Sequence, residues 1–242
     1  MARKDVSILK IAVMGKDGRF VKLRDLLAAQ GHEVTDSSGD ADVTVTRWPP
    51  EGKLCGGTVF TCGPAYAPKG VHDLLQDEDY QRKIAWMTAE GAIAAVMGKT
   101  GCAINGAECL VVGWGRIGRA LAERLAALGG RVTVLTRSRE KWREIEECGA
   151  VPGFTEDAEY QIRAKRFVFS TPPAMVISEK VLQNAGKDAV IIDLASPPYG
   201  VDVAAAEKIG IKAWREPGIP GRYCPENAAM AIYESIGGMI DD

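Results

Sequence analysis

The chain has 242 residues, a length that accommodates one or two domains of ordinary size. Its 30 Lys and Arg residues against 32 Asp and Glu residues leave a net charge of −2, so non-specific binding to nucleic acid or to an anionic membrane is not expected. No apolar run reaches the roughly 20 residues that a membrane span needs, and no signal peptide is evident. We therefore expect a globular, cytoplasmic protein.

The six cysteines contain no Cys-x-x-Cys pair, and several lie within apolar runs, as Cys109 does. This usage is typical of reduced, partly buried thiols in a cytosolic protein. Only two histidines are present, His32 and His72, and neither has a Cys or His at ligand spacing. We therefore expect no metal site.

Residues 1–98 are predicted to form a small α/β domain that supplies the substrate site. Short apolar runs indicate strands at 8–13, 43–46 and 58–61, and helical spacing of apolar residues indicates a helix at 20–30. A long helix follows at 79–97. Its interior Gly91 predicts close packing against another backbone or a ligand, a helix crossing being the simpler of the two.

Residues 99–224 show the alternation of a Rossmann-type, doubly wound parallel sheet, because several strands are apolar throughout, as expected when helices cover both faces. A final helix starts at Pro225, and we expect residues 225–242 to return to the N-terminal domain. The overall expectation is a two-domain architecture like that of the hydroxyacid dehydrogenases. The predicted elements in this half are strands at 109–112, 131–135, 167–170, 190–194 and 212–214, and helices at 116–128, 141–147, 203–209 and 225–240.

A glycine-rich fingerprint marks the start of this Rossmann domain. Gly113, Gly115 and Gly118 follow an apolar strand directly and open an amphipathic helix, which is the context that dinucleotide binding requires. The first glycine permits the tight turn, the second lets the backbone approach the pyrophosphate, and the third lets helix and strand pack closely. Arg116 and Ile117 complete the motif, whose helix N-terminus favours the negative charge of the pyrophosphate.

The end of the following strand indicates the preferred dinucleotide. An NAD-specific site has Asp or Glu there to bind the ribose hydroxyls. Here the residues are Thr136, Arg137, Ser138 and Arg139, which can bind a 2′-phosphate through guanidinium and hydroxyl groups. The sequence therefore predicts NADP rather than NAD as the cofactor.

Later strand ends are also expected to face the cofactor, because ligands of such sheets lie outside the carboxyl ends of the strands. Two such segments follow the predicted strands at 167–170 and 190–194, and a third, rich in Pro and Gly, leads into the last helix. The residues proposed from these three segments are Thr171, Pro172, Leu194, Ala195, Ser196, Pro217 and Gly218.

Several short motifs, in order and at matching spacing, resemble the A subunit of dipicolinate synthase. The resemblance covers most of residues 80–240 and the first 30, while the segment between the first helix and the long helix is shorter than in that family. It rests on Gly15-Lys16-Asp17-Gly18-Arg19, Thr88-Ala89-Glu90-Gly91, Asp193-Leu194-Ala195-Ser196, Asp202, Gly210-Ile211-Lys212-Ala213 and Pro217-Gly218-Ile219-Pro220-Gly221.

This resemblance implies an NADP-dependent oxidoreductase of spore-forming bacteria, at a branch of the lysine pathway. It would oxidise a dihydrodipicolinate-type intermediate to dipicolinate and work with a second, flavoprotein-like synthase subunit. Its small dicarboxylate substrate needs cations, for which Lys16, Arg19 and Arg222 are the candidates, with Thr88 beside them. The two catalytic candidates are Asp17, which would orient Arg19, and Glu90, which is expected as an interior carboxylate that serves as a weak base or orders a water.

Two other classes of function stay open. One is a non-catalytic, NADP-binding regulatory subunit, because the N-terminal domain is short and lacks obvious acid–base residues. The other is a 2-hydroxyacid-dehydrogenase-like enzyme, which would normally use an Arg and a His–carboxylate pair, although neither histidine lies in the second half. A homo-oligomer is expected in each case.

Overall fold

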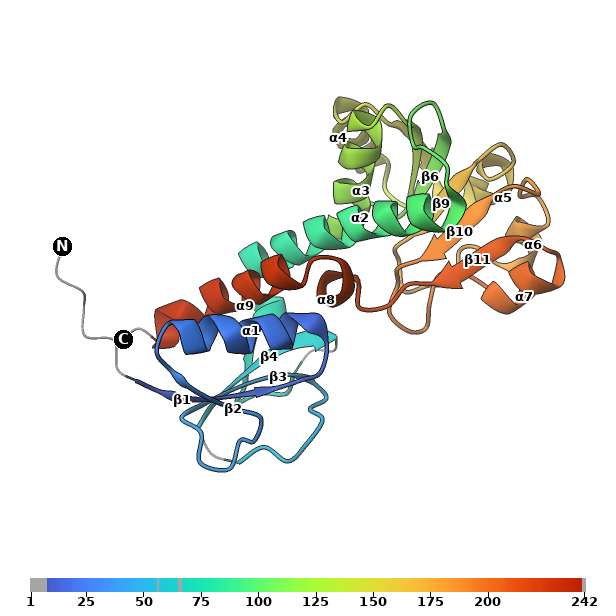
Figure 1. Ribbon diagram of the computed structural model, residues 1–242. Helices are drawn as coiled ribbons and strands as arrows, with labels where there is room; N and C mark the ends of the chain where they lie inside the picture. Colours follow the sequence, from blue (N-terminus) through green and yellow to red (C-terminus); the bar gives the residue numbers. More distant parts are fainter. Residues whose placement is uncertain (1–7, 56, 65–66, 241–242) are drawn as a thin grey trace. The chain divides into compact units, whose positions relative to one another are not determined.

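The computed structural model describes residues 8–55, 57–64 and 67–240, and it divides into two compact units (Figure 1). Unit 1 comprises residues 1–87 and 218–242, and unit 2 comprises residues 88–217. Each unit is built around its own parallel sheet with helices packed on it. The predicted two-domain, Rossmann-type α/β fold is confirmed.

Unit 1 contains a five-stranded parallel sheet in the order β2-β1-β3-β4-β5. The sequence predicted three of these strands. It missed β2 and β5 because strands of three and two residues show no measurable alternation. The strands are β1 (Lys10–Met14), β2 (Glu33–Thr35), β3 (Val43–Trp48), β4 (Thr58–Pro64) and β5 (His72–Asp73).

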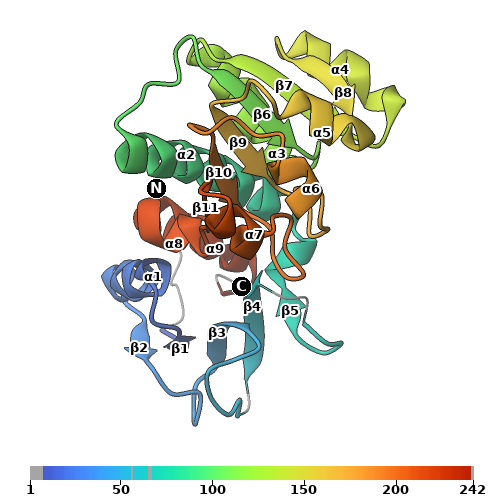
Figure 2. The same ribbon diagram turned by 90° about the vertical axis from the view of Figure 1, so that its right-hand side faces the viewer.

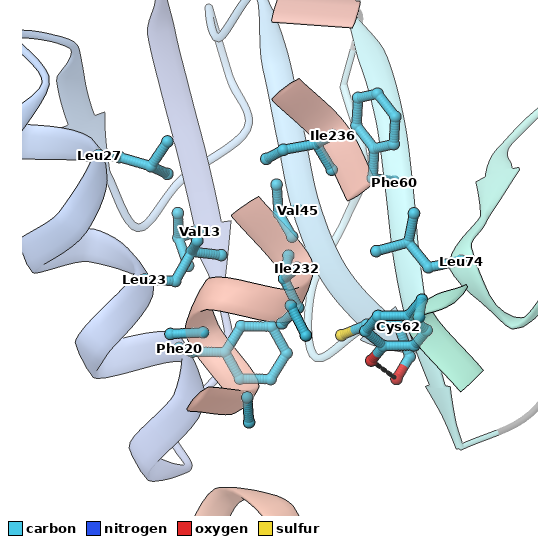
Figure 3. Close-up of a cluster of buried hydrophobic side chains, with 14 of the residues drawn as sticks. Val13, Phe20, Leu23, Leu27, Val45, Phe60, Cys62, Leu74, Ile232 and Ile236 are labelled. Atoms are coloured by element: carbon cyan, nitrogen blue, oxygen red, sulfur yellow. Dashed lines mark hydrogen bonds between the residues drawn. The ribbon is translucent and has the colours of Figure 1, made fainter. Parts of the chain in front are cut away.

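Two helices from opposite ends of the chain share the core of unit 1. They are α1 (Gly18–Ala29) and α9 (Pro225–Ile240). Phe20, Leu23 and Leu27 of α1 lie beside Ile232 and Ile236 of α9, and the five side chains face the strands (Figure 3). All five are fully buried, and burying a side chain of this kind contributes about 1.5–3 kcal/mol. A helix distant in sequence therefore completes the N-terminal core.

Helix α2 (Glu78–Thr100) is the longest helix in the described residues, and the boundary between the units falls within it. Its first turn carries Glu78 and Asp79 and its last turn Lys99, so these charges complement the helix dipole. Gly91 is buried in its interior.

Unit 2 contains a six-stranded parallel sheet in the order β11-β10-β9-β6-β7-β8 (Figure 2). The order reverses between β6 and β9, which is the topological switch point of a Rossmann sheet. The strands are β6 (Glu108–Val112), β7 (Arg131–Thr136), β8 (Val151–Phe154), β9 (Phe167–Ser170), β10 (Val190–Asp193) and β11 (Lys212–Arg215).

Helices cover this second sheet as expected for a doubly wound fold. Apolar side chains of α5, α6 and α7 pack with Leu110, Val168 and Ile191 on one face, and α3 packs against β6 and β7. The helices of unit 2 after α2 are α3 (Arg116–Ala127), α4 (Trp142–Glu147), α5 (Ala158–Gln161), α6 (Glu179–Leu182) and α7 (Val203–Lys208), while α8 (Ile219–Tyr223) belongs to unit 1.

Strand β8 is the element whose absence from the sequence prediction matters most. It contains Pro152 and Gly153, two residues that argue against a strand. The structure tolerates them because β8 pairs only with β7 and lies at the edge of the sheet.

Among the described residues, no helix is long and apolar enough to cross a membrane.

The six cysteines form no disulfide within the described part of the chain, and they differ strongly in environment. Burial raises the pKa of Cys62 and of Cys109 to about 11 each. The Arg166 guanidinium donates a hydrogen bond of 3.1 Å to the Cys102 sulfur and lowers the pKa of that thiol. Cys102 is only half-buried, so its thiolate is the more accessible nucleophile.

At pH 7 we expect iodoacetamide to alkylate Cys102 at least about tenfold faster than Cys62 or Cys109, because a lowered pKa leaves more thiolate. Arg166→Ala should slow the alkylation of Cys102, and its rate should then rise only at higher pH. Peptide mass mapping of protein labelled between pH 6 and pH 9, at time points, measures this. Arg163→Ala is the matched control, and an equal rate in both variants contradicts the assignment.

Candidate dinucleotide site

A cavity of about 620 Å³ opens at the carboxyl ends of β6, β7 and β9 in unit 2. This is the switch point of the sheet, where open α/β sheets bind their ligands. The cavity lies entirely within unit 2. Its lining residues are Val112, Gly113, Trp114, Gly115, Thr136, Arg137, Ser138, Thr155, Thr171, Pro172, Pro173, Ala174 and Val176.

The turn after β6 requires glycine at positions 113 and 118. Gly113 has φ +97°, a left-handed conformation that favours glycine. A Cβ atom on Gly118 would lie 2.0 Å from the Gly113 carbonyl oxygen, and one on Gly113 would lie 2.5 Å from Thr171 Oγ1. The loop and the first turn of α3 are therefore in backbone contact, as close helix–strand packing at a phosphate loop requires.

Gly115 is the N-cap of α3, and as a glycine it has no side chain with which to cap the helix. A Cβ atom on Gly115 would meet nothing within 4 Å, so the space beside the loop is open. The first N–H groups of a helix have no partner within the helix, and together with its dipole they favour an anion. The cradle therefore fits the pyrophosphate of a dinucleotide, with Arg116 and Ile117 supplying the first helical amides.

The end of β7 forms a second wall of the cavity. Thr136 Oγ1 accepts a hydrogen bond of 3.2 Å from the Ser138 amide, which fixes the turn. Arg137 and Ser138 both line the cavity, whereas Arg139 does not, and its guanidinium lies over the Trp142 ring at 5.3 Å. Among the described residues, no carboxylate lines the cavity. The sequence predicted the same role for both arginines, but the structure places only Arg137 in the cavity wall.

Several residues that line this cavity were not predicted from the sequence. Trp114 lies within the glycine motif, and its Nε1 donates to Glu144 Oε2 at 3.2 Å, which connects the loop to α4. Thr155 follows β8, the strand that was not predicted. Pro173, Ala174 and Val176 follow β9.

The residues after β9 and β10 behave differently from each other. Thr171 donates from Oγ1 to the Val112 carbonyl at 2.9 Å, so it links the two strand ends at the switch point. Leu194, Ala195 and Ser196 follow β10 and are not among the described residues that line the cavity. Pro217 and Gly218 are exposed and lie where the chain passes from unit 2 to unit 1. Their cofactor roles stay predictions.

The candidate substrate residues of unit 1 gather around the turn after β1. Asp17 caps α1 and receives the Arg19 guanidinium, with Nε at 3.0 Å from both carboxylate oxygens and Nη2 at 2.9 Å from Oδ2. A Cβ atom on Gly221 would lie 2.7 Å from Asp17 Oδ1, so α8, which carries Arg222, packs against this turn. Lys16 and Arg222 are exposed.

The Asp17 carboxylate stabilises the charge of the buried Arg19 guanidinium. Its side chain is 14% exposed. Burial lowers the pKa of Arg19, and the hydrogen-bonded Asp17 carboxylate raises it. Because Asp17 is occupied as acceptor for Arg19 and as helix cap, its geometry is that of a positioning group.

The expectation that Glu90 is an interior carboxylate is wrong. Its side chain is 58% exposed and pairs with Arg124 of α3 at 3.0 Å. Helical periodicity placed Glu90 beside buried residues but could not decide its face, because α2 is apolar on overlapping rows. Thr88, two residues earlier, is buried.

Comparisons with known proteins agree with this geometry. Residues 71–199 match the family described as "D-isomer specific 2-hydroxyacid dehydrogenase, NAD binding domain". The A subunit of dipicolinate synthase of Bacillus subtilis (strain 168) is 34% identical over 176 residues, which are 73% of this chain and 59% of that protein. The resemblance stated from the sequence is thus confirmed, although the alignment spans less than two thirds of the relative.

Solved structures show the same fold. The crystal structure of the dipicolinate synthase A subunit from Bacillus halodurans has a TM-score of 0.83 at 22% identity and covers 98% of this chain and 100% of its own. A transhydrogenase from Sinorhizobium meliloti has a TM-score of 0.75 at 14% identity, covering 96% and 94%. The match thus extends over both units of the chain.

Proposed function

The chain belongs to the D-isomer specific 2-hydroxyacid dehydrogenase family through its NAD-binding domain, and from this premise we propose that it is an NADP-dependent oxidoreductase. Its proposed reaction is the oxidation of a dihydrodipicolinate-type intermediate to dipicolinate, the product after which its Bacillus subtilis relative, a dipicolinate synthase subunit, is named. The observation that carries the choice of NADP is the wall formed by Arg137 and Ser138, without a carboxylate among the described residues of the cavity.

The residues of unit 2 would hold the cofactor in a fixed orientation. The Gly113 amide donates to the Leu135 carbonyl at 2.8 Å, so the amides that follow it, up to Gly118, would bind the pyrophosphate. Arg137 would bind the 2′-phosphate through paired hydrogen bonds. Thr171 and Pro172 would line the nicotinamide half. When bound, NADP supplies the hydride acceptor.

The substrate step needs positioning more than strong acid–base chemistry. Removing a hydride and a proton from a dihydropyridine ring leaves an aromatic product, so much of the driving force belongs to the substrate. Positioning alone can account for about 7–11 kcal/mol of a barrier. Lys16, Arg19 and Arg222 would bind the two carboxylates, with Asp17 orienting Arg19. Glu90 stays a prediction as base, in the exposed position described above.

We further propose a cytoplasmic protein that forms a homo-oligomer and works with a second, flavoprotein-like synthase subunit. The relative is named as one subunit of a synthase, which supports a partner chain. A regulatory subunit that binds NADP without turnover is the second candidate. It is favoured because the two carboxylates predicted for catalysis, Glu90 and Asp17, are both engaged in ion pairs.

The purified chain, supplied with enzymatically generated dihydrodipicolinate and NADP, should produce NADPH, measured by its absorbance. Replacing NADP by NAD should lower the rate, since the 2′-phosphate contacts are lost. The same assay is repeated with the second synthase subunit present. Tight NADP binding without turnover in both assays would reject the enzyme and favour the regulatory function.

A further inference from the structure

A buried carboxylate lies close to the dinucleotide cavity without lining it. Asp193, the last residue of β10, is 1% exposed. Its Oδ2 accepts hydrogen bonds from the amides of Gly200 at 3.0 Å and Val201 at 3.1 Å, and its Oδ1 accepts one from Ala195 at 3.1 Å. Burying a carboxylate is costly unless such bonds compensate it, so this group constrains the loop at 194–201 strongly.

That loop is joined directly to the wall of the cavity. The Gly200 carbonyl accepts the amides of Val176 at 3.2 Å and Ile177 at 2.9 Å, and Val176 lines the cavity. One residue, Gly200, therefore connects the Asp193 carboxylate to the segment that follows β9.

The same glycine packs against that segment from the side. A Cβ atom on Gly200 would lie 2.2 Å from Ser170 Oγ and 2.9 Å from the carbonyl oxygen of Pro172, another lining residue. Ser170 is fully buried, and its Oγ has no hydrogen-bond partner among the described residues. The loop and the wall are therefore in close contact at Gly200.

The loop holds a conformation that its own residues do not favour. Tyr199 has φ +70°, and it is the single non-glycine residue with positive φ in the described part of the chain. Such a conformation costs about 1–3 kcal/mol and persists only where surrounding contacts enforce it. The Arg215 guanidinium lies over the Tyr199 ring at 4.1 Å, and Asp193 holds the following residue.

We infer that Asp193 is a positioning residue, which through Gly200 sets the 171–176 wall of the cavity and so the binding of the nicotinamide half of the dinucleotide. This inference rests on the proposed NADP function. The adenosine 2′-phosphate would bind at the opposite wall, formed by the end of β7 with Arg137 and Ser138. Asp193 therefore acts on one half of the ligand and not on the other.

The test compares a whole ligand with half of it. Asp193→Asn removes the charge and one acceptor oxygen at nearly constant volume. It should raise the dissociation constant of NADP about tenfold, the change expected from weakening hydrogen bonds to a charged group. The dissociation constant of adenosine 2′,5′-bisphosphate, which carries only the adenine half, should change less than about twofold. Calorimetric titration measures both.

Asp202→Ala is the control variant. The Asp202 carboxylate caps α7 by accepting the Ala205 amide at 3.0 Å, so it stabilises a helix rather than the loop at 194–201. Its loss should leave both dissociation constants within about twofold, even where it lowers the melting temperature. A general loss of stability therefore cannot imitate the expected discrimination.

A second pair of variants keeps the test decisive if Asp193→Asn does not fold. Gly200→Ala should weaken NADP binding and spare that of the bisphosphate, and Ser170→Ala in the same chain should restore part of the loss by removing the nearest clash. If the variants weaken the binding of both ligands equally, or leave the binding of both unchanged, the inference is overturned. If the unaltered protein binds neither ligand, the proposed NADP function itself fails.

Discussion

Replacing Arg137 by Ala should raise the dissociation constant of NADP by about 10- to 100-fold and change that of NAD by less than about twofold. Hydrogen bonds to a charged group contribute about 1.5–3 kcal/mol, and only NADP carries the phosphate that would receive them. Arg137 lines the cavity at the end of β7, beside Ser138. Calorimetric titration with both dinucleotides measures the two changes.

Arg139→Ala is the control within the same turn. Its guanidinium lies over Trp142 and does not line the cavity, so this variant should lose much less NADP affinity. The sequence alone predicted equal roles for the two arginines, and the structure predicts unequal ones. Equal weakening of NADP and NAD by Arg137→Ala would refute the assignment of the 2′-phosphate to this wall.

Gly118→Ala should destabilise unit 2 by several kcal/mol and abolish measurable dinucleotide binding. The new Cβ would lie 2.0 Å from the carbonyl oxygen of Gly113, and because this neighbour is backbone, the first turn of α3 must move away from β6. Overpacking against side chains costs about 1–3 kcal/mol, and a backbone clash this short costs more. Thermal unfolding and dinucleotide titration measure the two effects.

Gly115→Ala separates binding from stability at the same loop. The new Cβ would meet no described protein atom within 4 Å, and the backbone conformation (φ −85°) suits alanine. The variant should therefore keep its melting temperature within a few degrees and still bind the dinucleotide at least about tenfold more weakly, because the methyl group occupies space that the pyrophosphate needs. Unchanged affinity would place the pyrophosphate elsewhere.

The Rossmann unit was predictable because local signals coincide in it. Fully apolar strands, an amphipathic helix from residue 116 and three glycines at fixed spacing all indicate the same structure. The N-terminal sheet was harder to predict, since β2 and β5 are short and lie at its two edges. Edge strand β8 was missed for a different reason, because Pro152 is tolerated only where the strand has a neighbour on one side.

Some residues of the candidate site could likewise be identified from the sequence, and others could not. The phosphate loop and the turn after β7 each consist of consecutive residues, so their composition already indicated which groups meet the ligand. Glu90 was placed wrongly because its exposure depends on which face of α2 is covered, and Arg124 comes from another helix. In the sequence, Asp193 stood out only as part of the motif Asp193-Leu194-Ala195-Ser196. The neighbouring residues do not show that its carboxylate accepts a hydrogen bond from the Gly200 amide.

Three features could be inferred from the order of the residues: the class of fold, the dinucleotide fingerprint and the lack of an acidic residue at 136–139, because each depends on residues near one another in the chain. Three others became evident only from the folded chain. They are which arginine faces the cavity, that α9 completes the core of unit 1, and that the Asp193 loop supports the 171–176 wall. These depend on side chains and backbone groups that packing brings into contact, and neither composition nor periodicity records such contacts.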